Sequence, residues 1–545
     1  YAIQKFKSTY PNSKFTTEAD EILAQVFLST NNYDDALTLI EGMKDKTPKI
    51  QEAYQKMAYY RAIELFNDNN FQKSDEYLNR SLKYLRDKSI EGLCYYTKSD
   101  IYHTMGQYDK SIEYGLKFIS FSDFLNPNYS TKASLGTQNY ILGYNYYKKN
   151  DFNKAKDYFE KADDQLALSK DKNIAQVIYP DAVLRAADCY FMLKNYPKSI
   201  QYYNKVVTNG FKGSDYAFFQ KSILEGLSGK TDEKIIGLKV MAQKFPNSLF
   251  ADDALLELGK TYFTIDKNGD AVATFNNLIK SYPKSELIPE AYLQLGLIAY
   301  NEDRYDDALR NYAYVTDNYK NTTSANEAMI AVKDIFIAKG DPEGYFAFIK
   351  KYPGANVSST TQDSVAYLAA ETQFSKGNFE GALKGFNNYL ISYPNGYFAL
   401  PAHFYRAECF YRNNEFDKAA LDYDFVTAQP ISRFTEKAVS RQAVVVYKQQ
   451  NYTKAYELFK KYKELASTDD AKREAILGLM RTSYKVKNYA DCIQNANEVL
   501  TLTGLSDYVI TEVKYFRGLS YFETTMYDKA KTDFNDVISK VQNEQ

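Results

Sequence analysis

The chain has 545 residues, of which 45% are hydrophobic, and its 68 basic and 69 acidic residues leave a formal net charge of −1. This length exceeds what one compact core can hold, so the composition predicts several domains or a repeat array. The balanced charge argues against an extended nucleic-acid-binding surface, and the lack of any apolar run of about 18 residues argues against a transmembrane helix.

The first ten residues predict the end of a helix that is already under way, and Pro11 follows it. No charged-then-apolar leader precedes them, so we expect that an upstream segment has been removed or trimmed. A signal sequence or a lipid anchor would lie in that segment, upstream of residue 1.

Two-helix units then follow one another to the end of the chain. Each has a small residue among apolar ones in its first helix, a polar break, and the pattern Ala-x-x-x-aromatic in its second helix. The small residue lets the neighbouring helix approach closely, and the ring one turn later fills the space. The small position of the second helix recurs about every 38 residues, which predicts about fourteen helix pairs. It holds Ala36, Ser74, Ser111, Ala155, Ser199, Lys234, Ala271, Ala308, Asp341, Ala382, Ala419, Ala455, Cys492 and Ala530.

Two steps of this repeat are longer than the others. Insertions are expected near residues 120–137 and 165–180, because both stretches contain polar and helix-breaking residues. Several units end in aromatic-Pro-x-small, as at Tyr282-Pro283. Proline ends the second helix there, and the small residue that follows can cap the next one.

The unit at Asp341 is irregular, with a polar, glycine-containing exit that predicts a short second helix. We expect a break at 341–362 that separates an N-terminal block, 1–340, from a C-terminal block, 363–545. One degenerate repeat within a continuous stack is the alternative, because each repeat of a solenoid contacts only its neighbours.

The repeat resembles the tetratricopeptide repeat (TPR), in which Leu-Gly-x-x-Tyr is followed by Ala-x-x-x-Phe and then Pro. The resemblance is carried by Leu258-Gly259, Tyr262, Ala271, Phe275 and Pro283, and again by Leu295-Gly296, Ala308 and Tyr312. It implies an all-α fold, a right-handed α-α superhelix (TPR solenoid). The aromatic-Pro-x-small endings further resemble TPR proteins of bacterial cell envelopes, including outer-membrane assembly lipoproteins and proteins of the Tol-Pal system.

The stretch GLSGKT, residues 226–231, looks like the end of a phosphate-binding P-loop. The full motif needs a glycine where Leu224 stands, and it follows a strand. In repeat register, Gly229 instead lies in the turn between two helices, where other units have Gly106 or Asn150. We interpret the stretch as a turn that binds no nucleotide.

No residues in the sequence predict a catalytic, cofactor-binding or metal-binding site. The two histidines, His103 and His403, lie in separate helices without a ligand-type partner at i+4. The four cysteines form no Cys-x-x-Cys motif and are expected to be buried. The sequence therefore predicts a protein that is not an enzyme and that needs no cofactor.

The TPR resemblance places the fifth, ninth, twelfth and thirteenth repeat positions of each first helix on a concave, ligand-facing side. These positions are rich in aromatic residues, some beside a cation, which suits an extended peptide or an amphipathic helix. Packing between helices is the alternative for each of them. The candidate binding residues are Tyr59, Tyr96, Tyr140, Tyr144, Tyr147, Lys148, Tyr367, Phe404, Tyr411, Arg412 and Tyr515.

The predicted function is a scaffold that binds partner proteins or peptides and no nucleic acid. No pair of units assembles the Lys, Arg and Asn cluster with which some TPR domains grip a C-terminal carboxylate. The alternative function is a carbohydrate- or small-ligand-binding protein that stacks its ligand on a Tyr-rich groove. The envelope resemblance implies the periplasm or an outer-membrane association, and the cytoplasm stays open.

Overall fold

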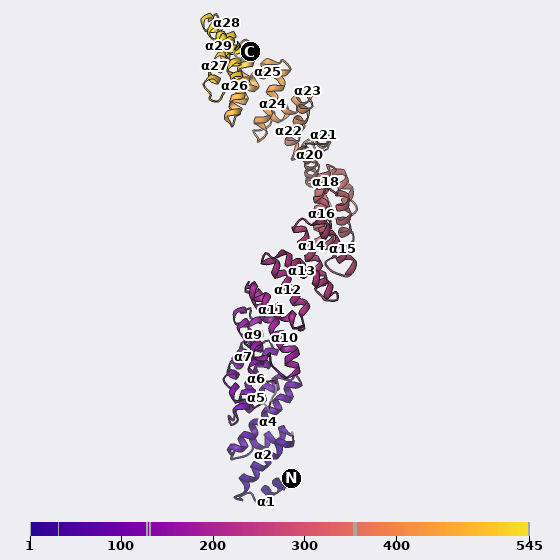
Figure 1. The fold of residues 1–545 in the computed structure, drawn as a ribbon, viewed down its shortest axis with the longest axis vertical. Coiled ribbons are helices and arrows are strands. Elements are labelled where there is room, and N and C mark those ends of the chain that lie inside the picture. Colours follow the sequence, from indigo (N-terminus) through magenta and orange to yellow (C-terminus); the bar gives the residue numbers. More distant parts are fainter. Residues whose placement is uncertain (1, 31, 127–128, 130–131, 353–356, 543–545) are drawn as a thin grey trace. The chain divides into compact units, whose positions relative to one another are not determined.

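The computed structural model describes residues 2–542 apart from 31, 127–128, 130–131 and 353–356. These residues are helical, with no strand among them, and the helices follow one another in tandem (Figure 1). None of the described helices is both long and apolar enough to span a bilayer. The elements are α1 (Ala2–Thr9), α2 (Thr16–Thr30), α3 (Tyr33–Glu41), α4 (Pro48–Asn67), α5 (Phe71–Ser81), α6 (Lys88–Thr104), α7 (Tyr108–Ile119), η1 (Ser122–Phe124), α8 (Leu135–Lys148), α9 (Phe152–Leu166), η2 (Ile174–Ile178), α10 (Tyr179–Met192), α11 (Tyr196–Thr208), α12 (Ser214–Leu227), α13 (Thr231–Lys244), α14 (Ala251–Thr264), α15 (Asn268–Ser281), α16 (Ile288–Asn301), α17 (Tyr305–Asn318), α18 (Thr323–Lys339), α19 (Pro342–Ile349), α20 (Ser359–Ser375), α21 (Phe379–Ser392), α22 (Ala399–Arg412), α23 (Phe416–Ala428), α24 (Thr435–Lys448), α25 (Tyr452–Leu465), α26 (Asp469–Lys485), α27 (Tyr489–Leu500), α28 (Asp507–Glu523) and α29 (Tyr527–Gln542).

The predicted pairing of helices is confirmed. From α2 with α3 to α28 with α29 the described helices form fourteen consecutive pairs, and each predicted small residue lies in or at the start of a second helix. Asp341 lies just before its helix, because its carboxylate caps α19 by accepting a hydrogen bond from Gly344 N at 2.9 Å. α1 precedes the first pair, where the end of one more helix was expected.

The chain forms two compact units, residues 1–291 and 292–545, and the division falls inside α16. The predicted irregular repeat at 341–362 lies within the second unit, and its residues 353–356 lie outside the described part of the chain. Its second helix, α19, has 8 residues where α17 and α21 have 14 each, so the predicted shortening is confirmed. A separation into two blocks at this repeat stays a prediction.

Small residues bring the two helices of a pair into direct contact. A Cβ atom added to Gly259 in α14 would lie 2.4 Å from the Phe275 ring in α15. One added to Gly296 in α16 would lie 2.6 Å from the Tyr312 ring in α17. Each ring therefore occupies the space that a side chain on the facing helix would need.

Serine at the small position of a second helix makes the same close approach. Ser74 Oγ donates a hydrogen bond to Ala62 O at 2.8 Å, and Ser199 Oγ donates one to Ala187 O at 2.9 Å. Both serines are fully buried, and the bond to the facing helix satisfies the hydroxyl. Alanine and serine are therefore interchangeable in size at this position.

The turn between the two helices of a pair contains a residue with a left-handed backbone. In GLSGKT this residue is Gly229, with φ +78°. The stretch begins in the last turn of helix α12 and ends at Thr231, the first residue of α13, as expected for an inter-helix turn. Many other units place a side chain at this position despite a cost of about 1 kcal/mol. These residues are Asn69, Asn150, Lys194, Asp266, Asp303, Asn414, Gln450, Lys487 and Thr525.

The two predicted insertions lie between helix pairs. The first links α7 to α8 and contains η1, and its residues 127–128 and 130–131 lie outside the described residues. The second links α9 to α10 and was expected to be a loop. Part of it, η2, is instead a π-turn that runs directly into α10, because Ile174 is buried in the core formed by α9 and α10.

Phe275→Ala tests the packing of a helix pair. The ring is fully buried, so its removal should lower the free energy of unfolding by about 3–5 kcal/mol through the cavity that it leaves. Urea unfolding followed by circular dichroism measures the change. Leu249→Ala is the control, because this side chain is 88% exposed and its loss should cost no more than about 0.5 kcal/mol. Equal effects of the two substitutions would contradict the packing.

Candidate functional site

Three of the predicted binding residues are buried in the helical cores. Tyr59 is 3% exposed, Tyr367 is 2% exposed and Phe404 is 4% exposed. Tyr367 also stacks on Phe398, with ring centroids 4.6 Å apart. Packing, the alternative that the sequence left open, is the role of these three side chains, because a ligand could reach none of them without a rearrangement of the core.

Aromatic residues at the twelfth repeat position pack against the start of the next helix. Tyr147 meets Phe152 edge-on at 5.5 Å, and Tyr411 meets Phe416 at 5.7 Å. The two rings of each contact are five residues apart in the sequence. Because the contact recurs in many units, the residue at the twelfth position has a packing role in them. It recurs at Phe66–Phe71, His103–Tyr108, Tyr300–Tyr305, Phe374–Phe379, Tyr447–Tyr452, Tyr484–Tyr489 and Phe522–Tyr527.

Four further candidates lie in separate helices. Tyr96 is half-buried, and Lys148 is exposed. The Arg412 guanidinium lies over the Phe379 ring at 4.3 Å, and Tyr515 is 47% exposed. None of these four lines the largest cavity described below, so their part in binding stays a prediction.

Tyr140 and Tyr144 do lie together, in a groove of about 800 Å³ within the unit 1–291. The first helices α8, α10 and α12 supply most of its lining, so the groove lies on the helices that the TPR resemblance assigns to the concave face. We call this site the α8–α12 groove. Its lining residues are Tyr140, Tyr144, Val177, Pro180, Asp181, Leu184, Arg185, Lys212, Gly213, Asp215, Tyr216 and Phe250.

Asp181, near the start of α10, holds the two tyrosines in place. Its Oδ2 accepts the Tyr140 hydroxyl at 2.9 Å and the Tyr144 hydroxyl at 2.5 Å, while Arg185 Nε donates to its Oδ1 at 3.3 Å. Burial, together with the charge of Asp181, raises the pKa of both tyrosines above their ordinary value. Both hydroxyls therefore stay protonated donors at neutral pH, and their rings are oriented before a ligand arrives.

Asp188, two turns further along α10, anchors the opposite wall of the groove. It is 4% exposed, accepts the Tyr203 hydroxyl at 2.6 Å and the Tyr216 hydroxyl at 3.2 Å, and forms an ion pair with Arg185. Burial raises the pKa of Asp188, and the charge of Arg185 opposes that rise. Arg185 thus bridges Asp181 and Asp188 and links the two walls.

The buried pair of Tyr203 and Asp188 is not needed to pack α10 on α11. Phe159 fills the same repeat position in α9, fully buried and without a hydroxyl. A buried hydroxyl and carboxylate are costly to desolvate, and the effect of the pair is to fix a carboxylate that holds Tyr216 and Arg185 of the groove lining. The same arrangement occurs in the second unit, where the Tyr423 hydroxyl donates to Glu408 Oε1 at 2.7 Å.

Sequence reasoning missed the groove residues that lie outside the four repeat positions it used. Asp181 and Tyr216 stand at the second position of their repeats, Arg185 stands at the sixth, and Phe250 precedes α14. The spacing Asp-x-x-x-Arg-x-x-Asp, from Asp181 to Asp188, is a signal that could have found them. It places two carboxylates and a guanidinium on one helix face.

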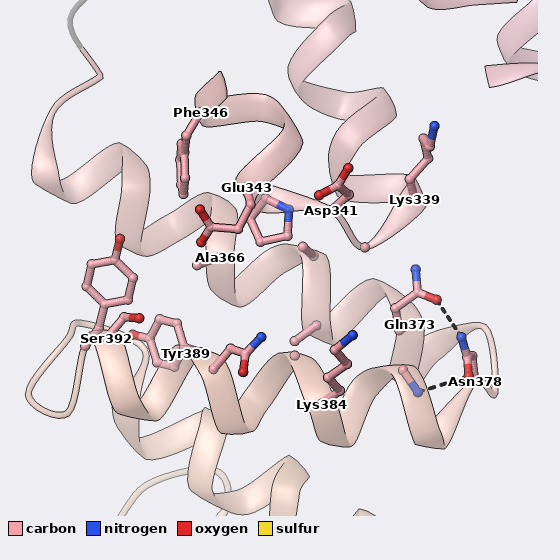
Figure 2. Close-up of a pocket in the computed structure, with 18 residues that line it drawn as sticks. Lys339, Asp341, Glu343, Phe346, Ala366, Gln373, Asn378, Lys384, Tyr389 and Ser392 are labelled. Carbon is pink, nitrogen blue, oxygen red and sulfur yellow. Dashed lines mark hydrogen bonds between the residues drawn. The ribbon is translucent and has the colours of Figure 1, made fainter. Parts of the chain in front are cut away.

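A second cavity, of about 300 Å³, lies beside the short helix α19 in the second unit (Figure 2). Small residues of α20 and α21, such as Ala366 and Gly385, line it together with the charged side chain of Lys384. At one end the Asn378 amide donates to Gln373 Oε1 at 2.9 Å. The cavity belongs to the irregular repeat, and none of the predicted binding residues lines it.

No group of three or more His, Cys, Asp or Glu side chains in the described parts of the chain could hold a metal ion. All four cysteines are buried free thiols, as expected. Burial raises the pKa of Cys94, Cys189 and Cys409 to about 12. These three thiols are therefore poor nucleophiles at neutral pH.

Tyr203→Phe tests the buried pair behind the groove. It removes a hydrogen bond to a carboxylate, so the free energy of unfolding should fall by about 1.5–3 kcal/mol. A double-mutant cycle with Asp188→Asn, read by urea unfolding, should give a coupling energy of about 0.5–3 kcal/mol. Tyr508→Phe, at a tyrosine that is 77% exposed, is the matched control and should be nearly neutral. Additive effects of the two buried substitutions would show that the pair contributes nothing.

Comparison with known proteins gives one family. Tetratricopeptide repeat profiles match residues 181–209 and 253–285, 367–428, and 94–122 and 139–164. No curated protein matches the chain.

Two solved structures are similar at low sequence identity. One, titled "Structure of Naa15/Naa10 bound to HypK-THB", is 13% identical with a TM-score of 0.38, over 90% of this chain and 76% of that one. The other is a tetratricopeptide repeat protein from Parabacteroides merdae, 16% identical with a TM-score of 0.27, over 49% of this chain and 100% of that one. The chain is thus similar to tetratricopeptide repeats over the matched stretches, and each of these stretches lies within the tandem helix pairs.

Proposed function

We propose that the chain is a non-enzymatic scaffold whose α8–α12 groove binds an extended segment of a partner protein. One observation carries the proposal: a groove of about 800 Å³ lined by Tyr140, Tyr144 and Tyr216, all three oriented by carboxylates of α10. Rings that are already fixed lose little freedom on binding, which favours affinity.

The lining of the groove indicates what kind of segment it takes. Asp181 and Asp215 balance Arg185 and Lys212 in charge, so the groove favours no strongly charged ligand. Its aromatic and aliphatic surface, including Phe250, suits the apolar side chains of a peptide, and the rim charges suit its polar backbone and ends.

We place this scaffold in a bacterial envelope, in the periplasm or at the outer membrane, with a lipid anchor upstream of residue 1. The support is the aromatic-Pro-x-small ending of several repeats, as at Tyr282-Pro283. The upstream coding sequence and fractionation of cells test the placement. A chain found in the cytoplasmic fraction, with neither a signal sequence nor a lipidated cysteine, would overturn it.

Photo-crosslinking from the groove tests the binding function. A photoreactive residue at Val177, which lines the groove and is 49% exposed, should crosslink a discrete partner protein in cells. Tyr140→Ala combined with Tyr216→Ala should reduce that crosslink by at least about tenfold, because it removes aromatic contact area. The control probe is at Ile236 in α13, which is 62% exposed and outside the groove.

Equal crosslinking from both positions, or a crosslink that the double variant leaves unchanged, would overturn the proposal. A signal that soluble glycans abolish, with no protein attached, would instead favour the carbohydrate-binding alternative.

A further inference from the structure

We infer that a second surface, in the unit 292–545, binds an acidic peptide segment through its Asp and Glu side chains. Four cations form it, Arg433, Lys437, Arg441 and Lys448, and we call it the basic surface. It shares no residue with the α8–α12 groove, and its test does not depend on that groove.

The cations of the basic surface lie on one side of α24. Lys437, Arg441 and Lys448 are spaced by four and seven residues, so they share a helix face, and Arg433 lies in the turn just before the helix. Arg433, Lys437 and Lys448 are exposed, and Arg441 is half-buried. The sequence concentrates positive charge here in a chain whose total charge is balanced.

One buried carboxylate faces these cations directly. Glu408 is 5% exposed and lies 3.4 Å from Lys437 Nζ and 3.6 Å from Arg441 Nε. At these distances the contacts are loose, and Arg441 Nε has no hydrogen-bond partner. Arg433 and Lys448 form no ion pair with any described residue. The exposed side-chain donors of Arg433 and Lys448 are therefore free for a ligand, whereas Arg441 Nε is buried.

The other acidic groups nearby are already engaged. Glu371 accepts the Tyr367 hydroxyl at 2.9 Å, and Glu436 accepts a hydrogen bond from Ser467 N at 3.2 Å. Burial raises the pKa of Tyr367, and the hydrogen bond to Glu371 raises it further, whereas the charge of Arg433 lowers it. Arg433 therefore lies close enough to this pair to act on it electrostatically. Asp417, beside the Phe416 ring that Lys448 covers, accepts a hydrogen bond from Gln449 Nε2 at 2.6 Å. With Glu408 these carboxylates equal the four cations in number, but each already accepts a hydrogen bond from a group other than the cations.

Aromatic rings hold the cations in fixed positions. Arg441 Cζ lies 4.8 Å from the centre of the Tyr411 ring, Lys448 Nζ lies 4.6 Å from that of Phe416, and Lys437 Nζ lies 5.8 Å from that of Phe404. A cation over a ring keeps its N–H donors available at its edge while its stem loses mobility. Phe404 and Tyr411, predicted as ligand contacts, therefore act here as supports for the cations.

The buried pair of Glu408 and Tyr423 also needs an explanation. Tyr423 is fully buried, and phenylalanine fills its repeat position in α21 at Phe386. The hydroxyl of Tyr423 holds the Glu408 carboxylate beneath Lys437 and Arg441, where it positions both cations without saturating them. Packing does not require the Tyr423–Glu408 pair, and we explain it by the need to position Lys437 and Arg441.

The basic surface is long enough that a ligand needs several carboxylates, not one, to contact all of its cations. Lys437 and Lys448 lie about 16 Å apart along the helix axis, a distance that one carboxylate cannot bridge. An extended segment of about five residues spans it. Acidic side chains at alternate positions of such a segment would face the cations together.

The probe that tests this inference is an acetylated and amidated seven-residue peptide with four glutamates, labelled for fluorescence anisotropy. We expect saturable binding that weakens as salt rises, because exposed ion pairs are screened. The same peptide with glutamine in place of glutamate should bind at least about tenfold more weakly. A free C-terminal carboxylate in place of the amide should change the affinity little.

Two double variants locate the binding on the protein. Lys437→Glu with Arg441→Glu should weaken binding at least about tenfold. Arg433→Gln with Lys448→Gln should weaken it less, and this variant leaves the buried pair of Glu408 and Tyr423 in place, so it stays folded. Lys460→Glu, an exposed lysine on the second helix α25, is the control and should bind as the unmodified chain does.

Equal affinity for the glutamate and glutamine peptides would overturn the inference, as would binding that both double variants leave intact. A single-stranded oligonucleotide or a peptide with a free C-terminus that binds more tightly than the acidic probe would overturn it as well. Failure of the Val177 crosslink would leave all of these measurements unchanged, so the two proposals fail separately.

Discussion

Close contact between two helices at a small residue is the constraint on which this structure depends. A ring of the second helix enters the space that a first-helix side chain would occupy, as Phe275 does over Gly259. The contact fixes the distance between the helices, and the period of about 38 residues follows from repeating it with short turns. Where the contact is altered, as at Asp341, the second helix shortens and a cavity opens beside it.

The cores also contain buried polar pairs, and two of those in the described residues share one arrangement. Tyr203 with Asp188, and Tyr423 with Glu408, replace a phenylalanine that packs as well elsewhere. In each case the buried carboxylate is paired with a half-buried arginine, Arg185 or Arg441. Each pair costs desolvation free energy, and in return its carboxylate orients nearby side chains. In the first unit these side chains belong to the α8–α12 groove, and in the second they are the cations of the basic surface.

The fold could be predicted from the sequence because its signals are local. Small residues, rings and turn residues recur at fixed spacing, so the helix pairs, the short α19 and the buried cysteines followed from the pattern. The π-turn η2 did not, because it depends on burial of Ile174 against helices that the local pattern does not describe.

The candidate site was only partly predictable, for a physical reason. Tyr59 and Tyr140 stand at the same repeat position, yet the first is buried and the second lines a groove. Burial at that position is decided by the side chains of the following repeat, which a single repeat pattern does not contain. Asp181 and Arg185 were missed because their role appears only when α8, α10 and α12 lie side by side.

The turns between paired helices have a consequence for how such a chain evolves. Their left-handed position accepts asparagine, aspartate, lysine, glutamine, threonine or glycine, as Asn69, Lys194, Thr525 and Gly229 illustrate. The backbone strain of each choice is confined to its own turn, and its cost is small beside that of a core cavity. Mutations can therefore accumulate turn by turn without changing the helix spacing, so lineages that share this architecture can drift far apart in sequence at their turns while their cores stay alike.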